Sequence, residues 1–176
     1  MRVVRGSLKG RRIQAPTHLP VRPTTDFAKE SLFNTLNNRV DFEELNVLDL
    51  FAGIGSISYE FASRGATSVL AIDNNPKCAD FIKQTIDKLH IENLRVMRTD
   101  AFAYIAKTRQ TFDIIFADPP YDLQTIHLLP SLIFEYNLLN PSGCFILEHS
   151  EKHDFSTFPQ FTELRKYGKV HFSFFN

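Results

Sequence analysis

The sequence predicts an α/β protein built on a doubly wound, mostly parallel sheet. From residue 46 onward, short apolar runs alternate with longer amphipathic runs, as strands alternate with crossover helices. Four of the apolar runs lead into an aspartate. The chain has 176 residues, of which 43% are hydrophobic, which suits one compact domain. We therefore expect a single domain, 1–176, with a basic arm over 1–25 and a Rossmann-like core over 26–176.

The expected strands are short apolar runs bounded by turn residues. They are placed at 46–51, 68–73, 94–100, 112–117 and 143–148. Parallel strands joined by right-handed crossovers give a doubly wound sheet. The tail, 162–175, alternates around Tyr167-Gly168, which predicts an antiparallel pair at one edge of the sheet.

The expected helices carry apolar residues three or four positions apart. They are placed at 56–64, 76–89, 101–107 and 124–136. Pro76 stands near a first turn, where its missing N–H costs least. A further helix over 27–36 precedes the sheet. Thr25 or Asp26 can cap it, with Glu30 near the reciprocal capping position.

The first 25 residues differ in charge from the rest of the chain. They hold six basic residues and no acid, whereas the remaining 151 residues hold 14 basic and 20 acidic residues. Val3-Val4 and 12–14 flank a Gly6–Gly10 turn, which predicts a hairpin. Taken alone, such a charge run is usually a solvated face; in an enzyme that acts on nucleic acid it would favour contact with RNA.

Composition excludes several classes of protein. No apolar run approaches the roughly 18 residues of a membrane span, and charges recur where a signal peptide would be apolar. Cys78 and Cys144 have neither a disulfide framework nor zinc-ligand spacing, and we expect both to be ordinary buried residues. The expectation is a soluble, cytoplasmic protein without a bound metal.

A glycine loop follows the first expected strand. Ligands of such sheets bind beyond the carboxyl ends of the strands. The run from Asp49 to Gly55 holds two glycines of a dinucleotide fingerprint, but Ser58 replaces the third. Asp73 lies 18 positions beyond Gly55, where an acceptor for ribose hydroxyls belongs. The pattern favours a nucleoside ligand without a pyrophosphate; close packing of helix on sheet is the alternative explanation for the glycines.

The tetrapeptide Asp118-Pro-Pro-Tyr121 ends the fourth expected strand. At ordinary residue frequencies it should occur by chance in about one chain in a thousand of this length. Its prolines fix the backbone, so the Asp118 carboxylate and the Pro119 carbonyl become adjacent rigid acceptors beside the Tyr121 ring. This arrangement fits a planar base with an exocyclic amino group. A strand that merely stops at a proline is the alternative.

Further motifs run through most of the chain. The arginine-rich arm leads into Val21-Arg-Pro-Thr-Thr-Asp26, and Ser31–Asn34, Leu48–Gly53, Glu148-His149 and Arg165-Lys-Tyr-Gly168 follow. With Asp118–Tyr121, these motifs resemble class I S-adenosylmethionine-dependent methyltransferases, and more closely the bacterial 16S rRNA guanine-N2 methyltransferases of the RsmD type. Two residues depart from the family pattern: Ile54 stands where Ser is common, and Phe27 where many members carry Arg.

The resemblance implies methyl transfer from S-adenosylmethionine to the N2 amino group of a guanine in 16S rRNA of the small ribosomal subunit. It implies a catalytic site of Asp118, Pro119, Pro120 and Tyr121, with Tyr121 stacking on an extruded base. The implied cofactor residues are Asp49, Phe51, Ala52, Gly53, Gly55, Asp73, Asn74, Asp100 and Ala101. The residues expected to contact RNA are Arg2, Arg5, Lys9, Arg11, Arg12, Arg22, Thr24 and Thr25.

Three other functions stay open at this point. Methylation of adenine N6 in DNA or RNA would use the same acceptors. A nucleotide-binding dehydrogenase is disfavoured by the missing third glycine, and a catalytically silent RNA-binding module by the intact tetrapeptide. His149, beside Glu148, is expected to support the end of the fifth strand rather than to act as a base. A monomer is expected.

Overall fold

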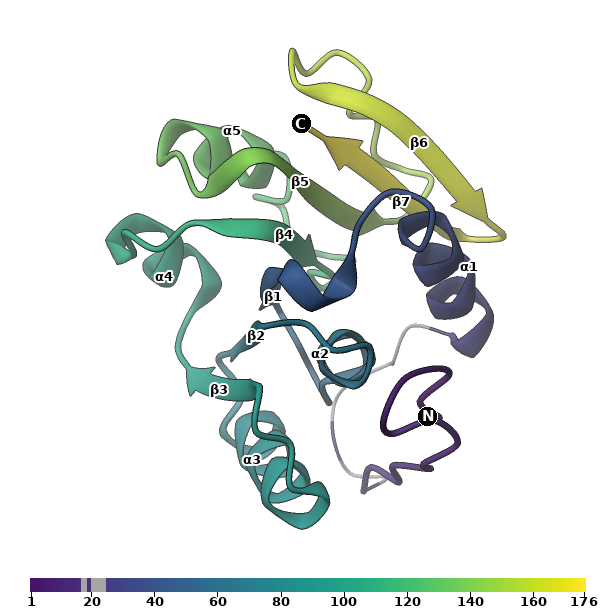
Figure 1. The fold of residues 1–176 in the computed structure, drawn as a ribbon. Coiled ribbons are helices and arrows are strands. Elements are labelled where there is room, and N and C mark those ends of the chain that lie inside the picture. The colour runs from purple at the N-terminus through teal and green to yellow at the C-terminus, as the bar shows by residue number, and fades with distance from the viewer. Residues whose placement is uncertain (17–18, 20–24) are drawn as a thin grey trace.

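The computed structural model describes residues 1–16, 19 and 25–176. Its centre is a seven-stranded sheet of order β3-β2-β1-β4-β5-β7-β6 (Figure 1). The first five strands in the chain pair in parallel, and β7 and β6 close one edge in antiparallel. The strands are β1 (Asn46–Leu50), β2 (Ser68–Asp73), β3 (Leu94–Arg98), β4 (Phe112–Ala117), β5 (Leu139–His149), β6 (Phe161–Tyr167) and β7 (Val170–Phe175). The predicted fold class is confirmed.

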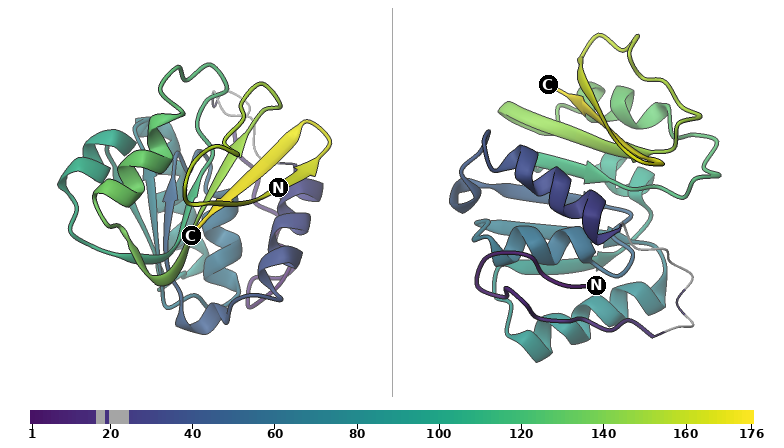
Figure 2. Two further views of the ribbon diagram at one scale, coloured as in Figure 1. Left: turned by 90° about the horizontal axis from the view of Figure 1, so that it is seen from above. Right: turned by 90° about the vertical axis from the view of Figure 1, so that its right-hand side faces the viewer.

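Helices cover both faces of the sheet (Figure 2). They are α1 (Asp26–Leu36), α2 (Ser56–Ser63), α3 (Pro76–Leu89), α4 (Ala101–Lys107) and α5 (Leu128–Glu135), with a 3-10 turn η1 (Phe42–Glu44) before β1. One apolar cluster packs α1, α2 and α3 on the sheet, and it includes Phe33, Phe61 and Ile82. A second cluster packs α4 and α5 on the other face through Ile105 and Leu129. The sheet therefore has a core on each side, as a doubly wound fold requires.

Three predicted elements differ from the structure by two or more residues at one end. The helix expected over 124–136 begins at Leu128, because turn bonds from the N–H groups of Leu123, Ile126 and Leu128 reach back only three residues. The strand expected over 143–148 begins at Leu139 and contains a register shift around Ser142, whose φ is +65°. The strand expected over 94–100 ends at Arg98.

The two predictions for the N-terminal part are corrected in detail. Thr25 caps α1 and accepts a hydrogen bond of 3.2 Å from the N–H of Ala28, so Ala28 holds the reciprocal position and Glu30 lies two residues beyond it. The predicted hairpin forms a turn with a single antiparallel bridge, Arg2 to Arg12, rather than two strands. The two chain segments that flank the Gly6–Gly10 turn nevertheless lie side by side, as the hairpin prediction requires.

Candidate functional site

A cavity of about 730 Å³ opens at the carboxyl ends of the parallel strands. It lies where the strand order reverses between β1 and β4, which is the usual ligand position in such sheets. Its volume is typical of a small-molecule site. The described lining includes these predicted residues: Thr25, Asp49, Phe51, Ala52, Gly53, Asp73, Asn74, Asp100, Ala101, Asp118, Pro119, Pro120 and Tyr121. Residues predicted from four separate strand ends therefore meet in one cavity.

The loop after β1 is held in place by Asp73 at the end of β2. One carboxylate oxygen of Asp73 accepts from the N–H of Gly53 at 2.7 Å, and the other accepts from the N–H of Asn75 at 2.8 Å. Gly53 has φ +55°, and Phe51, which is not a glycine, has φ +61°. A bulky residue in this region is strained, so the surrounding structure must hold it there. Burial raises the pKa of Asp73, while the two backbone donors oppose that rise.

Gly55 lies on the other side of the same loop and is absent from the described lining of the cavity. A Cβ built on Gly55 would lie 2.9 Å from the ring of Tyr59 and 3.2 Å from Ile82. Its φ of +79° also suits glycine. These contacts match the alternative explanation, in which the second glycine allows α2 to pack closely, and they place Gly55 apart from the predicted cofactor residues.

Asp49 is a buried carboxyl that faces the cavity from β1. Burial raises its pKa to about 7, the hydrogen bonds from the side chain and backbone of Ser58 oppose that rise, and the nearby Asp73 carboxylate adds to it. A carboxyl of this kind gains most when a cation enters the cavity beside it. The position therefore suits a ligand with a positively charged group.

Ser56 begins α2 and also lines the cavity. Its buried hydroxyl finds no hydrogen-bond partner among the residues that the structure describes. Gly55, which precedes it at the N-cap, has no side chain to satisfy the first N–H groups of the helix. A helix N-terminus and an unpartnered hydroxyl together form a corner that suits a carboxylate.

The Asp118–Tyr121 segment lies across the cavity from Asp73. The N–H of Asp118 bonds to the carbonyl of Leu50 at 3.4 Å, which ties the segment to the end of β1. Pro119 is buried, and the Pro120 carbonyl accepts from the N–H of Leu123 at 2.9 Å in a tight turn. The ring of Tyr121 is 53% exposed at the cavity mouth. Asp118 is half-buried, so it can meet both a ligand and solvent.

Several cavity residues escaped the sequence-based prediction. Glu148 is the last residue but one of β5 and is buried, and the pairing of Ala117 with Leu147 places Asp118 and Glu148 near neighbouring strand ends. The rule that ligands bind at carboxyl strand ends could have identified Glu148. Tyr167 and Lys169, at the turn between β6 and β7, also line the cavity. The Arg165-Lys-Tyr-Gly168 motif contains Tyr167 but does not place it at the cavity, because an antiparallel edge turn reaches the cavity only through the tertiary fold.

His149 supports the end of β5. Its Nδ1 donates to the Ser150 carbonyl and its Nε2 accepts from the Ser173 hydroxyl, both at 2.8 Å, which assigns the neutral tautomer. Burial lowers the pKa of His149 to about 4. The imidazole is therefore neutral at physiological pH and satisfied on both nitrogens.

Burial keeps both cysteine thiols protonated at physiological pH. Cys78 lines the cavity and Cys144 is half-buried, and burial raises the pKa of each thiol to about 11. Among the described residues, no three His, Cys, Asp or Glu side chains gather as they would around a metal ion. Within the same part of the chain, no helix is long and apolar enough to cross a membrane.

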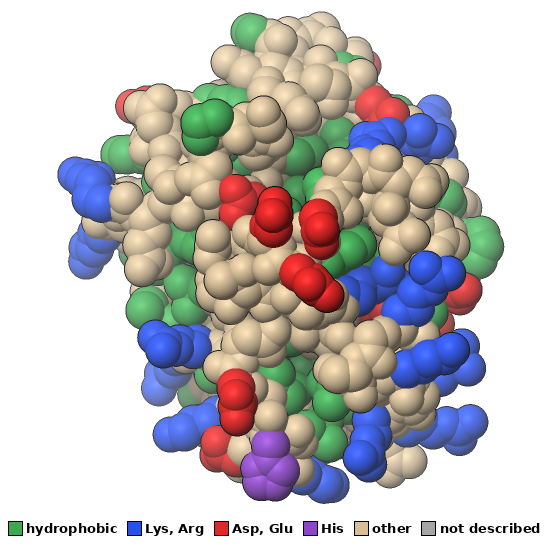
Figure 3. All heavy atoms as spheres, in the orientation of Figure 1, with side chains coloured by type: hydrophobic (Ala, Val, Ile, Leu, Met, Phe, Trp, Pro, Cys, Tyr) green, Lys and Arg blue, Asp and Glu red, His purple; other side chains and the backbone are tan. Residues whose placement is uncertain are grey.

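The described cationic side chains of the arm lie outside the cavity, whereas Thr25, at the end of the arm, lines it. The side chains of Arg2, Arg5, Lys9, Arg11 and Arg12 are exposed, and the described cavity lining contains none of them. Arg22 and Thr24 lie outside the described residues. In Figure 3, Lys and Arg side chains gather along the right-hand margin, which carries the arm and α1. The structure thus presents a cationic margin separate from the cavity.

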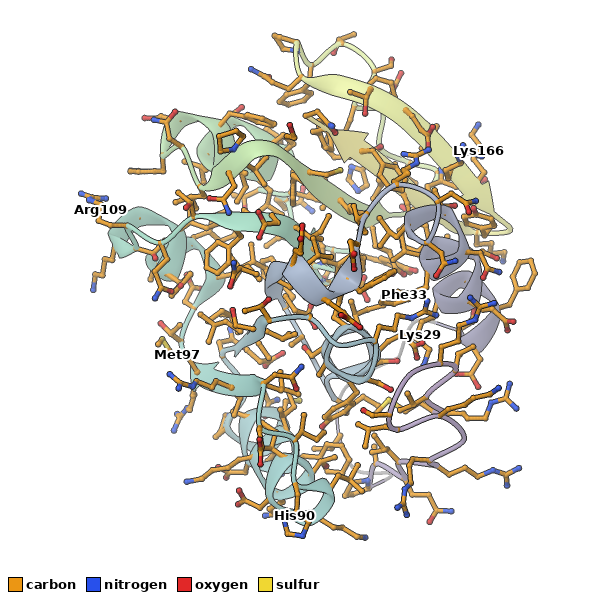
Figure 4. All side chains as sticks on the ribbon, in the orientation of Figure 1. Lys29, Phe33, His90, Met97, Arg109 and Lys166 are labelled. Carbon is orange, nitrogen blue, oxygen red and sulfur yellow. The ribbon has the colours of Figure 1, made fainter. Side chains whose placement is uncertain are left out.

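The backbone of the arm is anchored on α2 by a buried carboxylate. Glu60 accepts from the N–H groups of Val4 at 2.8 Å and Arg5 at 3.1 Å, and from Nε of Arg64 at 2.9 Å. Lys29, which points from α1 toward the arm in Figure 4, donates to the Arg2 carbonyl at 2.6 Å. The arm is therefore held by its backbone, which leaves its arginine side chains in solvent.

Comparisons with known proteins agree with this geometry. A model of the family described as Conserved hypothetical protein 95 matches residues 1–176. The "Putative rRNA methyltransferase YlbH" of Bacillus subtilis (strain 168) is 38% identical over 156 residues, which span 86% of this chain and 84% of that protein. The "Ribosomal RNA small subunit methyltransferase D" of Buchnera aphidicola subsp. Baizongia pistaciae (strain Bp) is 30% identical over 148 residues, spanning 84% of this chain and 75% of that protein.

A solved structure shares the whole architecture. The structure titled "Putative methyltransferase yhhF from Escherichia coli" superimposes with a TM-score of 0.87 at 25% identity and covers 99% of this chain and 96% of its own. The two proteins therefore share one fold over almost their full lengths.

Proposed function

The chain belongs to the family described as Conserved hypothetical protein 95, and from this membership we propose that it is an S-adenosylmethionine-dependent rRNA methyltransferase. One observation carries the proposal: Asp118–Tyr121 and the loop held by Asp73 line the same cavity. An acceptor pair for an amino group and a nucleoside-binding loop are the two parts that methylation of a base requires.

The cofactor side of the cavity fits S-adenosylmethionine group by group. Asp73, fixed by two backbone donors, would accept from the ribose hydroxyls. Asp49 would pair with the cationic amino group, and the unpartnered Ser56 hydroxyl with the α2 N-terminus would hold the carboxylate. Phe51, Ala52, Gly53, Asn74, Asp100 and Ala101 would complete this side. When bound, the cofactor supplies an electrophilic methyl group.

Asp118 and Pro119 would orient the nucleophile. The amino nitrogen of a base is a poor nucleophile because its lone pair is delocalised into the ring. Acceptance of its two N–H bonds by the Asp118 carboxylate and the Pro119 carbonyl directs the lone pair toward the methyl group. As nitrogen gains the methyl group it becomes cationic, and Asp118 takes up the proton that the nitrogen loses. Tyr121, exposed at the mouth, would stack on the extruded base, with Pro120 fixing its position.

Glu148 supports guanine N2 as the acceptor. Guanine presents two adjacent donors, N1–H and the N2 amino group, and a carboxyl group beside Asp118 can accept from that edge. Adenine presents an acceptor at N1, so it would place a lone pair against the Glu148 carboxylate. N6 methylation of adenine in DNA or RNA is therefore the second candidate.

The remaining assignments follow from this proposal. The substrate would be 16S rRNA in the small ribosomal subunit, in keeping with the name of the Buchnera relative, a small subunit methyltransferase. The arm, 1–25, would contact RNA, and 26–176 would form the catalytic core of a single domain. A monomer acting in the cytoplasm would suffice, because one chain supplies both sides of the cavity.

The test is methyl transfer from labelled S-adenosylmethionine to purified small subunits, naked rRNA and duplex DNA. Nucleoside analysis after digestion should find the label in N2-methylguanosine from small subunits or their RNA. Label in N6-methyladenosine would establish the second candidate. Absence of transfer to all three substrates, with S-adenosylmethionine bound, would contradict the proposal.

A further inference from the structure

Phe27, in the first turn of α1, is unusually exposed for a large aromatic residue. It is 68% exposed, and together with Tyr121 it is one of the two most exposed large hydrophobic side chains among the described residues. Isolated exposed apolar residues are ordinary on protein surfaces. The position of Phe27 is not ordinary, because Thr25, two residues earlier, lines the cavity. Tyr167, which the Phe27 ring contacts, lines the same cavity as Tyr121.

Phe27 contacts a second aromatic residue of the cavity. Its ring lies edge-on to Tyr167, with centroids 6.2 Å apart and an interplanar angle of 81°. Tyr167 is itself held by the ring of Phe172 at 5.9 Å and by its hydroxyl, 3.4 Å from that of Thr35. A ring fixed in this way cannot fold over Phe27 and cover it. The outer surface of Phe27 is therefore left available for contact.

An exposed lysine lies close to Tyr167 in the chain. Lys169, two residues after Tyr167, also lines the cavity. Lys166, the residue before Tyr167 in β6, leaves the strand on the opposite face. An exposed aromatic surface beside a cation is typical of single-stranded nucleic-acid sites, where bases stack on the rings and cations neutralise phosphates.

We propose that Phe27 and Tyr167 form a stacking edge for a nucleobase adjacent to the target base, with Lys169 on an adjoining phosphate. This inference rests on the proposed function and adds to it a subsite for a flanking nucleotide. An extruded target base leaves its neighbours unstacked, and a ring at the cavity margin offers one of them a new stacking partner. The exposed Lys169 at the cavity favours RNA over an apolar protein partner.

The inference is tested by the binding of single-stranded RNA and by the kinetics of methyl transfer. Phe27→Ala should weaken RNA binding about tenfold, or about 1.4 kcal/mol, and raise the KM for RNA while kcat stays within about twofold. Phe27→Trp should bind as tightly as the wild type. Phe27→Leu, which keeps apolar volume without a π-face, should resemble the alanine variant. Met97→Ala, which removes an exposed apolar side chain from β3, is the matched control.

Two readouts separate stacking from a structural role. Thermal unfolding and S-adenosylmethionine affinity should be unchanged in all the Phe27 variants, because the ring is exposed and the cofactor side lies elsewhere. Wild-type RNA affinity in both Phe27→Ala and Phe27→Leu would overturn the inference. RNA binding needs no methyl transfer, so this outcome is distinct from failure of the proposed function, in which the wild type binds RNA and cofactor but transfers no methyl group.

Discussion

The two sides of the cavity are built in contrasting ways. On the proposed cofactor side, side chains at the ends of β1 and β2 are buried or held by backbone donors, as Asp49 and Asp73 are. On the proposed substrate side, Tyr121 and Phe27 are largely exposed and Lys169 lies on an edge turn. The contrast teaches that the cofactor-side carboxylates are fixed in position before any ligand binds. The substrate-side rings and lysine are exposed to solvent, as expected for a surface that binds a large partner. Variants on the two sides should therefore fail in different assays.

The largest expected effect is on the transfer step itself. Asp118→Ala should lower methyl transfer by about 10²-fold or more, because it removes a positioned group that accepts a proton. S-Adenosylmethionine affinity should change little. The measurement is single-turnover transfer at saturating RNA, with Asp122→Ala, an exposed carboxylate one residue beyond Tyr121, as the control. Near-normal turnover of the Asp118 variant would contradict the role of Asp118 in methyl transfer.

A smaller effect is expected on the cofactor side. Asp73→Ala should weaken S-adenosylmethionine binding by about 1–3 kcal/mol, since a charged acceptor is removed and its partners are left unpaired. RNA affinity should be unaffected. Calorimetric titration with S-adenosylmethionine measures the affinity of the Asp73 variant. Asp80→Ala, which removes an exposed aspartate from α3, is the control. Unchanged cofactor affinity would show that the ribose is held by other residues.

The pH dependence of cofactor binding sharpens the role of Asp49. Its pKa is raised to about 7 in the free protein, so the carboxyl is mostly protonated below pH 7 and mostly ionised above it. A cationic ligand needs the ionised form, so affinity should rise about tenfold from pH 6 to pH 8 and then level off. Asp49→Asn should bind weakly at every pH, without this rise. A rise that persists in the asparagine variant would assign the titration to another group.

The same carboxyl makes a linked prediction for stability. Because the folded protein favours protonated Asp49, its contribution is fully present below the unfolded pKa of about 4 and is lost as pH rises through about 7. The asparagine side chain does not ionise, so it loses no stability as the pH rises. Without cofactor, the free energy of unfolding of Asp49→Asn minus that of the wild type should therefore be more positive at pH 8 than at pH 4. Urea titrations at the two pH values measure this difference.

The smallest effect concerns the described cationic side chains of the arm, none of which lines the cavity. Replacing Arg11 and Arg12 with Gln should weaken RNA binding and reduce the slope of log K against log salt by roughly 0.7–0.9 for each phosphate that is no longer neutralised. Cofactor affinity should stay the same, because the arm is anchored on Glu60 and not on cavity residues. Arg109→Gln, an exposed arginine after α4, is the control. A wild-type slope in the double variant would mean that the arm does not bind RNA.

Local sequence predicted most of the elements. The strands at 68–73 and 112–117 and the helices at 76–89 and 101–107 have the predicted bounds. Each is defined by apolar periodicity and by neighbouring turn or capping residues, which act within a few positions. The helix expected from residue 124 begins later because successive three-residue turn bonds occupy the backbone after Pro120. Periodicity alone does not register such bonds.

The sequence by itself determined which aspartates lie near the carboxyl ends of parallel strands, and because these strands share one edge it also placed Asp49, Asp73 and Asp118 together. Only the tertiary structure decided what faces them. The antiparallel edge brings Tyr167 and Lys169 over the cavity, 46 or more residues beyond Tyr121 in the chain, and α1 brings Phe27 beside them. Side chains so far apart in sequence have no shared periodicity, so their meeting is set by sheet pairing and helix packing.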